Sequence, residues 1–246
     1  MRVAALYDIH GNLPALEAVL QEVRQAAVDH IVVGGDVLPG PMPDETMRCL
    51  LELETPVQFI YGNCEVAVLE QMAGKEPVRM PKPYHPTIRW TAERVHGYQQ
   101  TLAGWPKTIR LDIPGSGAVL FCHATPRNED EIFTRLTPED RLAPILDGLD
   151  VSMVVCGHTH MQFDRMVGNT RVVNAGSVGM PFGEPGADWL LLGPDVQLRH
   201  TSYDLGEAAE RIRATGFPYP DDFAARYVLQ PPSEKDMLDA FTRASI

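Results

Sequence analysis

The sequence predicts an α/β fold, and three observations support that prediction. Short apolar runs alternate with helical patterns over the first 65 residues, an order typical of parallel strands joined by crossover helices. Each run is followed within two residues by Asp or Gly, which marks a turn. The chain has 246 residues, of which 44% are apolar and 22% charged. This is the composition of a globular protein long enough to bury a substantial core.

The first part of the chain is predicted to contain strands and helices in strict alternation. The first helix has apolar residues at helical spacing and carries Pro14 in its first turn. Asp44 is the expected N-cap of the second helix. The predicted strands are 3–7, 30–33 and 57–60, and the predicted helices are 13–27 and 44–53.

The rest of the chain is less regular. A proline-rich basic stretch at 74–87 precedes a longer predicted helix at 87–102. The last strand-like runs resemble an antiparallel meander, and about three helical segments follow, the final one capped by Ser233. We therefore expect one domain over 1–204 with a C-terminal helical extension, 205–246, packed on it. The further predicted elements are strands at 108–113, 118–122, 151–156, 162–167, 170–174, 189–192 and 197–202 and a helix at 138–146.

Charge, hydropathy and cysteine usage exclude several classes of partner. The net charge of −12 disfavours long nucleic acids, because phosphate binding needs cationic side chains. No apolar stretch approaches the roughly 18 residues of a membrane span, so no membrane partner is expected. The four cysteines form no C-x-x-C pair and several lie in apolar runs. They are typical of reduced thiols, which predicts a cytoplasmic location.

Polar side chains follow five of the predicted strands, at the point where each strand ends. In open α/β sheets, ligand sites form outside the carboxyl ends of the strands, so these side chains are expected to meet at one edge. Asp8 and His10 are two residues apart, as are His158 and His160, and in extended backbone this spacing places both side chains on one side. The motifs are Asp8-Ile9-His10-Gly11-Asn12, Gly35-Asp36, Gly62-Asn63, His123 and Gly157-His158-Thr159-His160.

Carboxylate, amide and imidazole ligands together suit divalent metals such as Mn²⁺, Fe²⁺, Zn²⁺ or Ni²⁺. Seven such side chains are too many for one tetrahedral ion. They suit two ions that share a carboxylate, a pair that can clamp a phosphoryl group and generate hydroxide at neutral pH. Each motif alone is a common turn or a histidine with a structural partner. The prediction depends on the whole set appearing in order after successive strands.

This ordered set resembles the calcineurin-like metallophosphoesterases, whose pattern is D-x-H, G-D, G-N-H-[DE], H and G-H-x-H. The resemblance spans roughly residues 1–180 and includes Asn174 to Gly179, which is similar to the Gly-Ser turn of small prokaryotic members. It implies a four-layer α/β/β/α sandwich and two divalent ions per chain, with Mn²⁺ expected first and Fe, Zn, Ni or Mg as alternatives. It implies that one ion is held by Asp8, His10 and His160, the other by Asn63, His123 and His158, with Asp36 bridging them.

The chain departs from the pattern at Cys64, where many members have a histidine that assists the leaving group. A thiol, with a pKa of about 8.5, is a poorer hydrogen-bond partner for a developing alkoxide. Cys64 is therefore either a catalytic residue or a small filler, and a small prokaryotic phosphodiesterase-like subgroup also has cysteine here. Asn12 either acts in catalysis and substrate binding or holds its own turn. Arg127 either binds a phosphate oxygen or forms a surface salt bridge.

The resemblance implies hydrolysis by attack of a metal-bridging hydroxide on a small phosphorylated substrate. Because general acid help, worth about 10²–10⁴-fold, is weak with a thiol, we expect phosphodiester or phosphoanhydride substrates of nucleotide type. The alternatives are a non-catalytic interaction module, as in relatives that serve as trafficking scaffold subunits, a phosphomonoesterase or protein phosphatase, and a nuclease for short oligonucleotides. The C-terminal helices could cap the fold or form a homo-oligomer contact.

Overall fold

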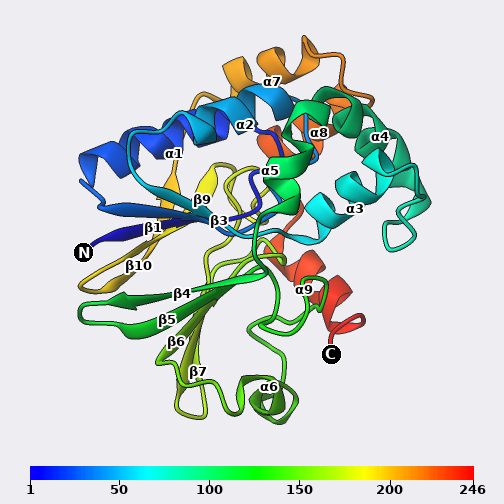
Figure 1. The fold of residues 1–246 in the computed structure, drawn as a ribbon. Coiled ribbons are helices and arrows are strands. Elements are labelled where there is room, and N and C mark those ends of the chain that lie inside the picture. The colour runs from blue at the N-terminus through cyan, green and yellow to red at the C-terminus, as the bar shows by residue number, and fades with distance from the viewer.

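The computed structural model describes residues 1–246 and contains two five-stranded sheets that face each other between outer helices (Figure 1). This is the α/β/β/α sandwich that the resemblance implied. The first sheet has the order β10 (Val196–Thr201), β9 (Ala187–Leu192), β1 (Val3–Leu6), β2 (His30–Val33) and β3 (Val57–Phe59). The second has the order β4 (Thr108–Ile113), β5 (Gly117–Cys122), β6 (Met153–Cys156), β8 (Thr170–Asn174) and β7 (Phe163–Val167).

Most helices cover the outer face of the first sheet, one packs on the second sheet, and α9 (Glu234–Thr242) lies at the edge of the sandwich (Figure 1). The single helix on the second sheet, α6 (Glu139–Leu146), packs Leu142 and Ile145 against Val154 and Val172. The other helices are α1 (Leu13–Gln25), α2 (Pro43–Leu51), α3 (Asn63–Met72), α4 (His85–Arg94), α5 (Gln99–Ala103), α7 (Leu205–Arg213), α8 (Pro220–Phe223) and α9 (Glu234–Thr242). None of them is both long enough and apolar enough to cross a membrane.

Strand β1 lies at the centre of the molecule and is buried on both faces. Ala4 and Leu6 pack against the helices, whereas Val3 and Ala5 pack against the second sheet. This division follows from the pleat, which sends successive side chains to opposite faces. The parallel pairing of β1 with β2 and of β2 with β3 confirms the predicted crossovers. A strand covered on both faces is uniformly apolar, as the VAAL run of β1 is.

Two local predictions are wrong. The helix expected at 87–102 is divided into α4 and α5 by a 3₁₀ turn at His96–Tyr98, which includes Gly97, a poor helix former. The N-cap of α2 is Met42, with Pro43 as the first helical residue. Asp44 instead lies in the first turn, where its carboxylate accepts a hydrogen bond from the Tyr98 hydroxyl at 3.2 Å.

The predicted meander is also incorrect. Strands β7 and β8 are antiparallel, but β8 continues the second sheet by pairing with β6 in parallel. The β9–β10 hairpin crosses to the first sheet and pairs with β1. Turn residues indicated where the runs end, but they did not indicate which sheet each run joins. That choice depends on long-range packing, to which both inner sheet faces contribute.

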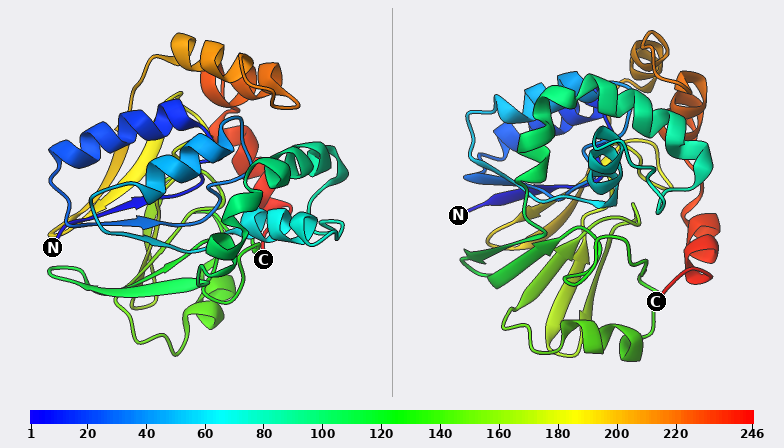
Figure 2. Two further views of the ribbon diagram at one scale, coloured as in Figure 1. Left: turned by 45° about the horizontal axis from the view of Figure 1, so that its top comes forward. Right: turned by 45° about the vertical axis from the view of Figure 1, so that its right-hand side comes forward.

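The C-terminal helices pack on the body of the protein. Phe217, Phe223 and Val228 form an apolar cluster with Met42 of the first-sheet side. Between α8 and α9 the chain forms a short π-helical segment, Ala224–Leu229. Ser233 caps α9 as predicted, because its hydroxyl accepts a hydrogen bond from the Asp236 amide at 3.1 Å. In the right-hand view of Figure 2, α9 (red) lies at the edge of the sandwich.

Candidate metal centre

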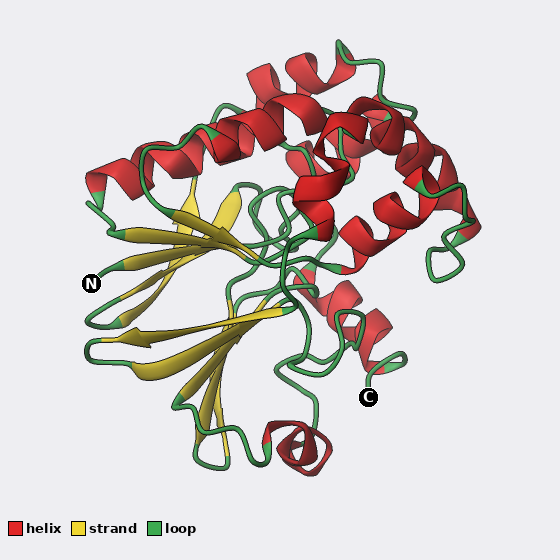
Figure 3. Cartoon of the chain, viewed as in Figure 1, coloured by secondary structure: helices red, strands yellow, loops and turns green.

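The loops that follow β1, β2, β5 and β6 gather at one edge of the two sheets (Figure 3). They hold the residues that the sequence motifs singled out. Asp8 follows β1, Asp36 follows β2, and His123 comes directly after β5. Asn63 is the first residue of α3. The sandwich therefore brings together side chains that lie as much as 152 positions apart in the sequence, from Asp8 to His160.

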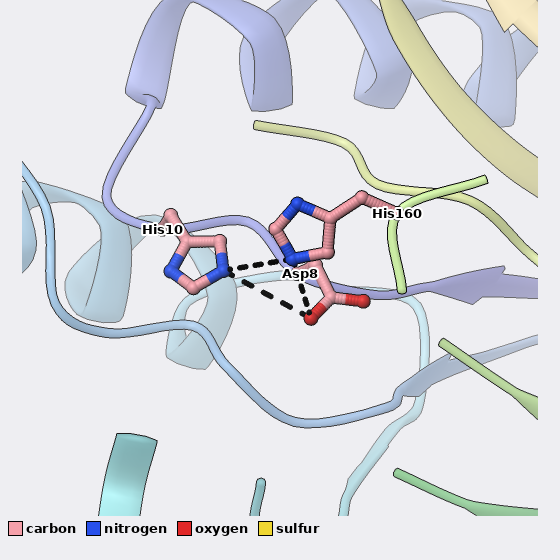
Figure 4. A group of neighbouring side chains, drawn as sticks. All are labelled: Asp8, His10 and His160. Carbon is pink, nitrogen blue, oxygen red and sulfur yellow. Dashed lines mark hydrogen bonds and ion pairs between the residues drawn. The ribbon is translucent and has the colours of Figure 1, made fainter. Parts of the chain in front are cut away.

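The first group consists of Asp8, His10 and His160, whose ligand atoms all lie within 4.8 Å of one another. Figure 4 shows the two imidazoles and the carboxylate pointing toward one another. The Nε2 atom of His160 is 3.2 Å from Asp8 Oδ1 and 3.3 Å from Nε2 of His10. The set matches the first of the two ligand groups implied by the resemblance.

The second group consists of Asp36, His123 and His158, again with ligand atoms within 4.8 Å. Oδ2 of Asp36 is 3.5 Å from Nε2 of His123 and 3.9 Å from Nε2 of His10. Asp36 therefore faces both groups. The amide oxygen of Asn63 lies 3.1 Å from the same nitrogen of His123, so all seven side chains of the expected ligand set meet here.

The donor atoms fit a bound cation better than they fit one another. Oδ1 of Asp8 is buried and has no hydrogen-bond partner within the protein, although three imidazole nitrogens face it at 3.2–3.9 Å. A buried carboxylate oxygen without a partner is costly. Nδ1 of His123 lies 2.9 Å from the Gly34 carbonyl, and Nδ1 of His160 lies 2.8 Å from the Met180 carbonyl. Each Nδ1 must therefore carry the hydrogen, which leaves Nε2 free to bind a metal.

Electrostatics also favour this role. Burial opposes the charge of Asp8, but the imidazoles of His160 and His123 outweigh it and hold the pKa of Asp8 below its usual value. Burial, with the neighbouring histidines, lowers the pKa of His10 to about 4 and that of His158 to about 4. At neutral pH His10 and His158 are therefore neutral imidazoles, the state that a divalent cation requires. For His123 and His160 burial also opposes the charge, but the Asp36 and Asp8 carboxylates outweigh it, raising the pKa of His123 to about 10 and that of His160 above its usual value, so these two rings release a proton when a cation binds.

Five of these residues have a left-handed backbone. The φ angles of Asp8, His10 and Asp36 are 53°, 47° and 51°, and those of His158 and His160 are 67° and 56°. Non-glycine residues rarely adopt this region, at a cost of order 1–3 kcal/mol each. Cross-loop hydrogen bonds maintain it: the Asp8 amide donates to the Gly35 carbonyl at 3.1 Å, and the His158 amide donates to Asp8 Oδ2 at 2.8 Å. Backbone strain concentrated in this way is typical of functional sites.

Glu65 holds two of the loops in place, a role that the sequence motifs did not indicate. Its side chain is fully buried. Oε2 accepts hydrogen bonds from the amides of Asp36 at 2.7 Å and Gly62 at 2.8 Å, and Oε1 accepts one from Leu38 at 3.1 Å. Burial and the nearby Asp36 raise the pKa of Glu65 to about 7. Its carboxylate thus fixes the loops that carry Asp36 and Asn63.

Replacing Glu65 with glutamine tests this role. Glutamine has one acceptor oxygen, so its amide group must oppose at least one of the three backbone N–H groups. We expect the free energy of unfolding, measured by denaturant titration in the presence of chelator, to fall by about 1–3 kcal/mol. Glu70→Gln, on the same helix, is the control and should change stability by less than about 0.5 kcal/mol. Equal stability of the two variants would contradict the role.

The other predicted site residues are engaged elsewhere. Asn12 is fully buried; its side chain caps α1 by accepting from the Ala15 amide at 3.3 Å, and it donates to the Gly179 carbonyl at 2.9 Å. The structure thus favours the interpretation in which Asn12 holds its own turn. Arg127 is exposed and forms an ion pair with Glu131 at 2.7 Å, which favours the surface salt bridge over phosphate binding.

Cys64 lies beside the two groups. Its Sγ atom is within 4.8 Å of ligand atoms of His10 and Asp36, and its backbone amide donates to Asp36 Oδ1 at 2.9 Å. Burial and the Asp36 carboxylate raise the pKa of the thiol well above its usual value. A thiol is therefore present at neutral pH. From the basic stretch, Met80 covers Asn63, with its sulfur 3.9 Å from the amide nitrogen.

Comparisons with known proteins agree with this geometry. The model of the calcineurin-like phosphoesterase superfamily domain matches residues 1–193. An uncharacterized protein of Methanocaldococcus jannaschii is 28% identical over 238 residues, covering 88% of this chain and 93% of its own. Phosphodiesterase YfcE of Escherichia coli is 28% identical over 205 residues, covering 80% and 89%.

Solved structures show the same fold. A hypothetical protein from Pyrococcus horikoshii has a TM-score of 0.78 at 20% identity, covering 94% of this chain and 99% of its own. A metallophosphoesterase from Sphaerobacter thermophilus has a TM-score of 0.70 at 24% identity, covering 92% and 98%. Because the family model spans most of the chain and its sequence motifs meet at one edge of the sandwich, this protein belongs to the calcineurin-like phosphoesterase superfamily.

Proposed function

We propose that this protein is a phosphodiesterase-type hydrolase that binds two divalent cations and acts on phosphodiester or phosphoanhydride bonds of small, nucleotide-like substrates. The observation that carries the proposal is the pair of acid and histidine groups that face each other across Asp36. When bound, a pair of divalent ions supplies a hydroxide nucleophile and neutralises phosphate charge. The similarity to the E. coli phosphodiesterase supports the substrate class.

The ligand types indicate which cations the site accepts. The set combines two carboxylates, one amide oxygen and four imidazoles, a mixture that suits borderline metals over Ca²⁺. We propose Mn²⁺ as the principal ion, with Fe, Zn, Ni or Mg as alternatives. The neutral state of His10 and His158, which burial enforces, leaves these two imidazoles ready to bind a cation at neutral pH.

The residue at position 64 determines which leaving groups the site can expel, because it sets whether a proton donor is available. Cys64 lies beside the two groups, at the sequence position where many family members have a proton-donating histidine. The residue is buried, with 5% of its surface exposed. Nucleotide phosphates and aryl oxides leave as anions without an acid, whereas alkyl oxides benefit from one. We therefore expect chelator-stripped protein, reloaded with Mn²⁺, to hydrolyse bis(p-nitrophenyl) phosphate and diadenosine tetraphosphate faster than alkyl phosphomonoesters. Fast turnover of alkyl monoesters alone would contradict the proposal.

Replacing Cys64 with histidine is expected to raise kcat for alkyl phosphomonoesters. An imidazolium at this position donates a proton to the leaving oxygen, an effect worth up to about 10²-fold. The measurement is kcat for a primary alkyl phosphate with Mn²⁺, alongside p-nitrophenyl phosphate and the aryl diester. The matched control is Cys64→Ala, which should retain aryl diester turnover within a few-fold. If the alanine variant loses the aryl diesterase activity, the thiol itself takes part in the reaction.

A further inference from the structure

The His160 imidazole is stacked on an aromatic ring that the sequence motifs do not include. The rings of His160 and Phe182 have centroids 5.3 Å apart and planes inclined by 20°. The backbone joins the same two residues, because the Phe182 amide donates to the His160 carbonyl at 3.2 Å. One face of the imidazole is therefore covered by Phe182, while Nδ1 is held by the Met180 carbonyl and Nε2 faces Asp8.

Phe182 is in turn held by the C-terminal helix. Phe241 of α9 lies against it, with ring centroids 6.1 Å apart. The next residue, Gly183, donates its amide hydrogen to the Pro232 carbonyl at 2.9 Å, just before α9 begins. An aromatic chain thus runs from Phe241 through Phe182 to His160.

Helix α9 is itself attached to the second-sheet side at both ends. Near its start, Glu234 forms a two-pronged ion pair with Arg135, at 2.8 and 2.9 Å. Beyond its end, the amide of Ile246 donates to the Ile132 carbonyl at 3.1 Å. Both ends of α9 are therefore attached to the 132–135 segment, which comes after the strand that leads into His123. The right-hand view of Figure 2 shows this helix (red) at the side of the molecule, between its upper and lower halves.

Core packing does not account for the aromatic pair. Phe182 and Phe241 are both only half-buried, and neither belongs to the apolar clusters that form the cores. His160, in contrast, has a left-handed backbone with φ of 56°, a conformation that persists only where surrounding contacts over-determine it. Helix α9 also lies beyond residues 1–193, the part that the family model matches.

We propose that Phe182, supported by Phe241, is a positioning residue that fixes the His160 imidazole for cation binding, so that α9 sets the metal affinity of the first group. The inference rests on the proposed two-cation function. Phe182 acts through His160: it limits rotation of the ring, so that Nε2 stays directed toward Asp8 and His10 without a further loss of side-chain entropy when the cation binds.

The test is Mn²⁺ titration calorimetry on chelator-stripped wild type, Phe182→Ala, Phe182→Tyr and Phe241→Ala. We expect Phe182→Ala to weaken one of the two binding steps by about tenfold or more, the scale of an outer-shell partner, and to leave the other unchanged. Phe182→Tyr, which keeps the ring, should restore the affinity. Phe241→Ala should weaken the same step less. At saturating Mn²⁺ the turnover of all variants should approach that of wild type.

Phe217→Ala is the matched control, because Phe217 belongs to the C-terminal extension but packs in its apolar cluster with Phe223. It should lower stability and leave both Mn²⁺ steps unchanged. Unaltered Mn²⁺ binding in Phe182→Ala, or the same weakening in Phe217→Ala, overturns the positioning role while the two-cation function stands. Absence of binding in the wild type overturns both. Thermal melts of the chelator-stripped variants check that each variant is folded.

Discussion

Replacing Asp36 with asparagine is expected to abolish measurable hydrolysis and to reduce bound Mn²⁺ from two ions per chain to at most one. Asp36 is the carboxylate that faces both groups, with Oδ2 at 3.5 Å from His123 Nε2 and 3.9 Å from His10 Nε2. Asparagine keeps the shape and the Oδ1 contact to the Cys64 amide but removes the negative charge. Loss of a direct ligand should exceed the roughly 10–100-fold cost of losing an outer-shell partner.

Metal content after gel filtration, measured by mass spectrometry, and turnover of bis(p-nitrophenyl) phosphate together check this result. Asp164→Asn is the control, because Asp164 lies on β7 and pairs with Arg171 at 2.6 Å, outside the centre. It should retain the full metal content and activity. An Asp36→Asn protein that still binds two ions and turns over normally would show that Asp36 does not bridge them.

Replacing Gly62 with alanine is expected to produce the second-largest loss, through sterics alone. The backbone of Gly62 is extended, with φ of −103° and ψ of −177°, so alanine can adopt it. A Cβ atom there would lie 2.1 Å from Asp36 Oδ1 and 2.8 Å from the Asp36 amide nitrogen. Asp36 must therefore move, and a displacement of about 1 Å is expected to reduce activity by about 10²-fold. The overpacking should cost about 1–3 kcal/mol of stability.

Gly97→Ala provides the comparison, because a Cβ atom at that position has nothing within 4 Å. Both variants are measured by denaturant unfolding and by aryl diester turnover at saturating Mn²⁺. Gly97→Ala should match wild type in turnover, and its stability should be equal or higher by up to about 1 kcal/mol. If Gly62→Ala also matches wild type, then Asp36 can shift at no cost, and the close approach of these two loops does not position it.

The residues that meet at the centre could be identified from the sequence because each lies in the turn that follows a strand. Parallel strands of an α/β sheet end at the same edge. Once the strands before Asp8, Asp36 and His123 are predicted to run in parallel, these residues are therefore predicted to lie at one edge. The sequence could not show that β5 and β6 belong to a separate sheet, since the two sheets meet only through buried side chains such as Val3 and Phe121. The two-sheet sandwich was predicted from the family resemblance alone.

Other features of the site have no sequence signal. The left-handed backbone of Asp8, His10 and His160 is imposed by hydrogen bonds between loops, which local propensity does not encode. Phe182 meets His160 because α9 returns to the edge of the sheets, a contact between distant segments. For Asn12, two interpretations were open, and only the observed partners of its amide distinguished them.

Anomalous diffraction from crystals of the Mn²⁺-loaded protein tests the central claim most directly. We predict two peaks, one among Asp8, His10 and His160 and one among Asn63, His123 and His158, with the Asp36 carboxylate between them. A single peak, or peaks placed away from these residues, would contradict the assignment of a two-cation centre.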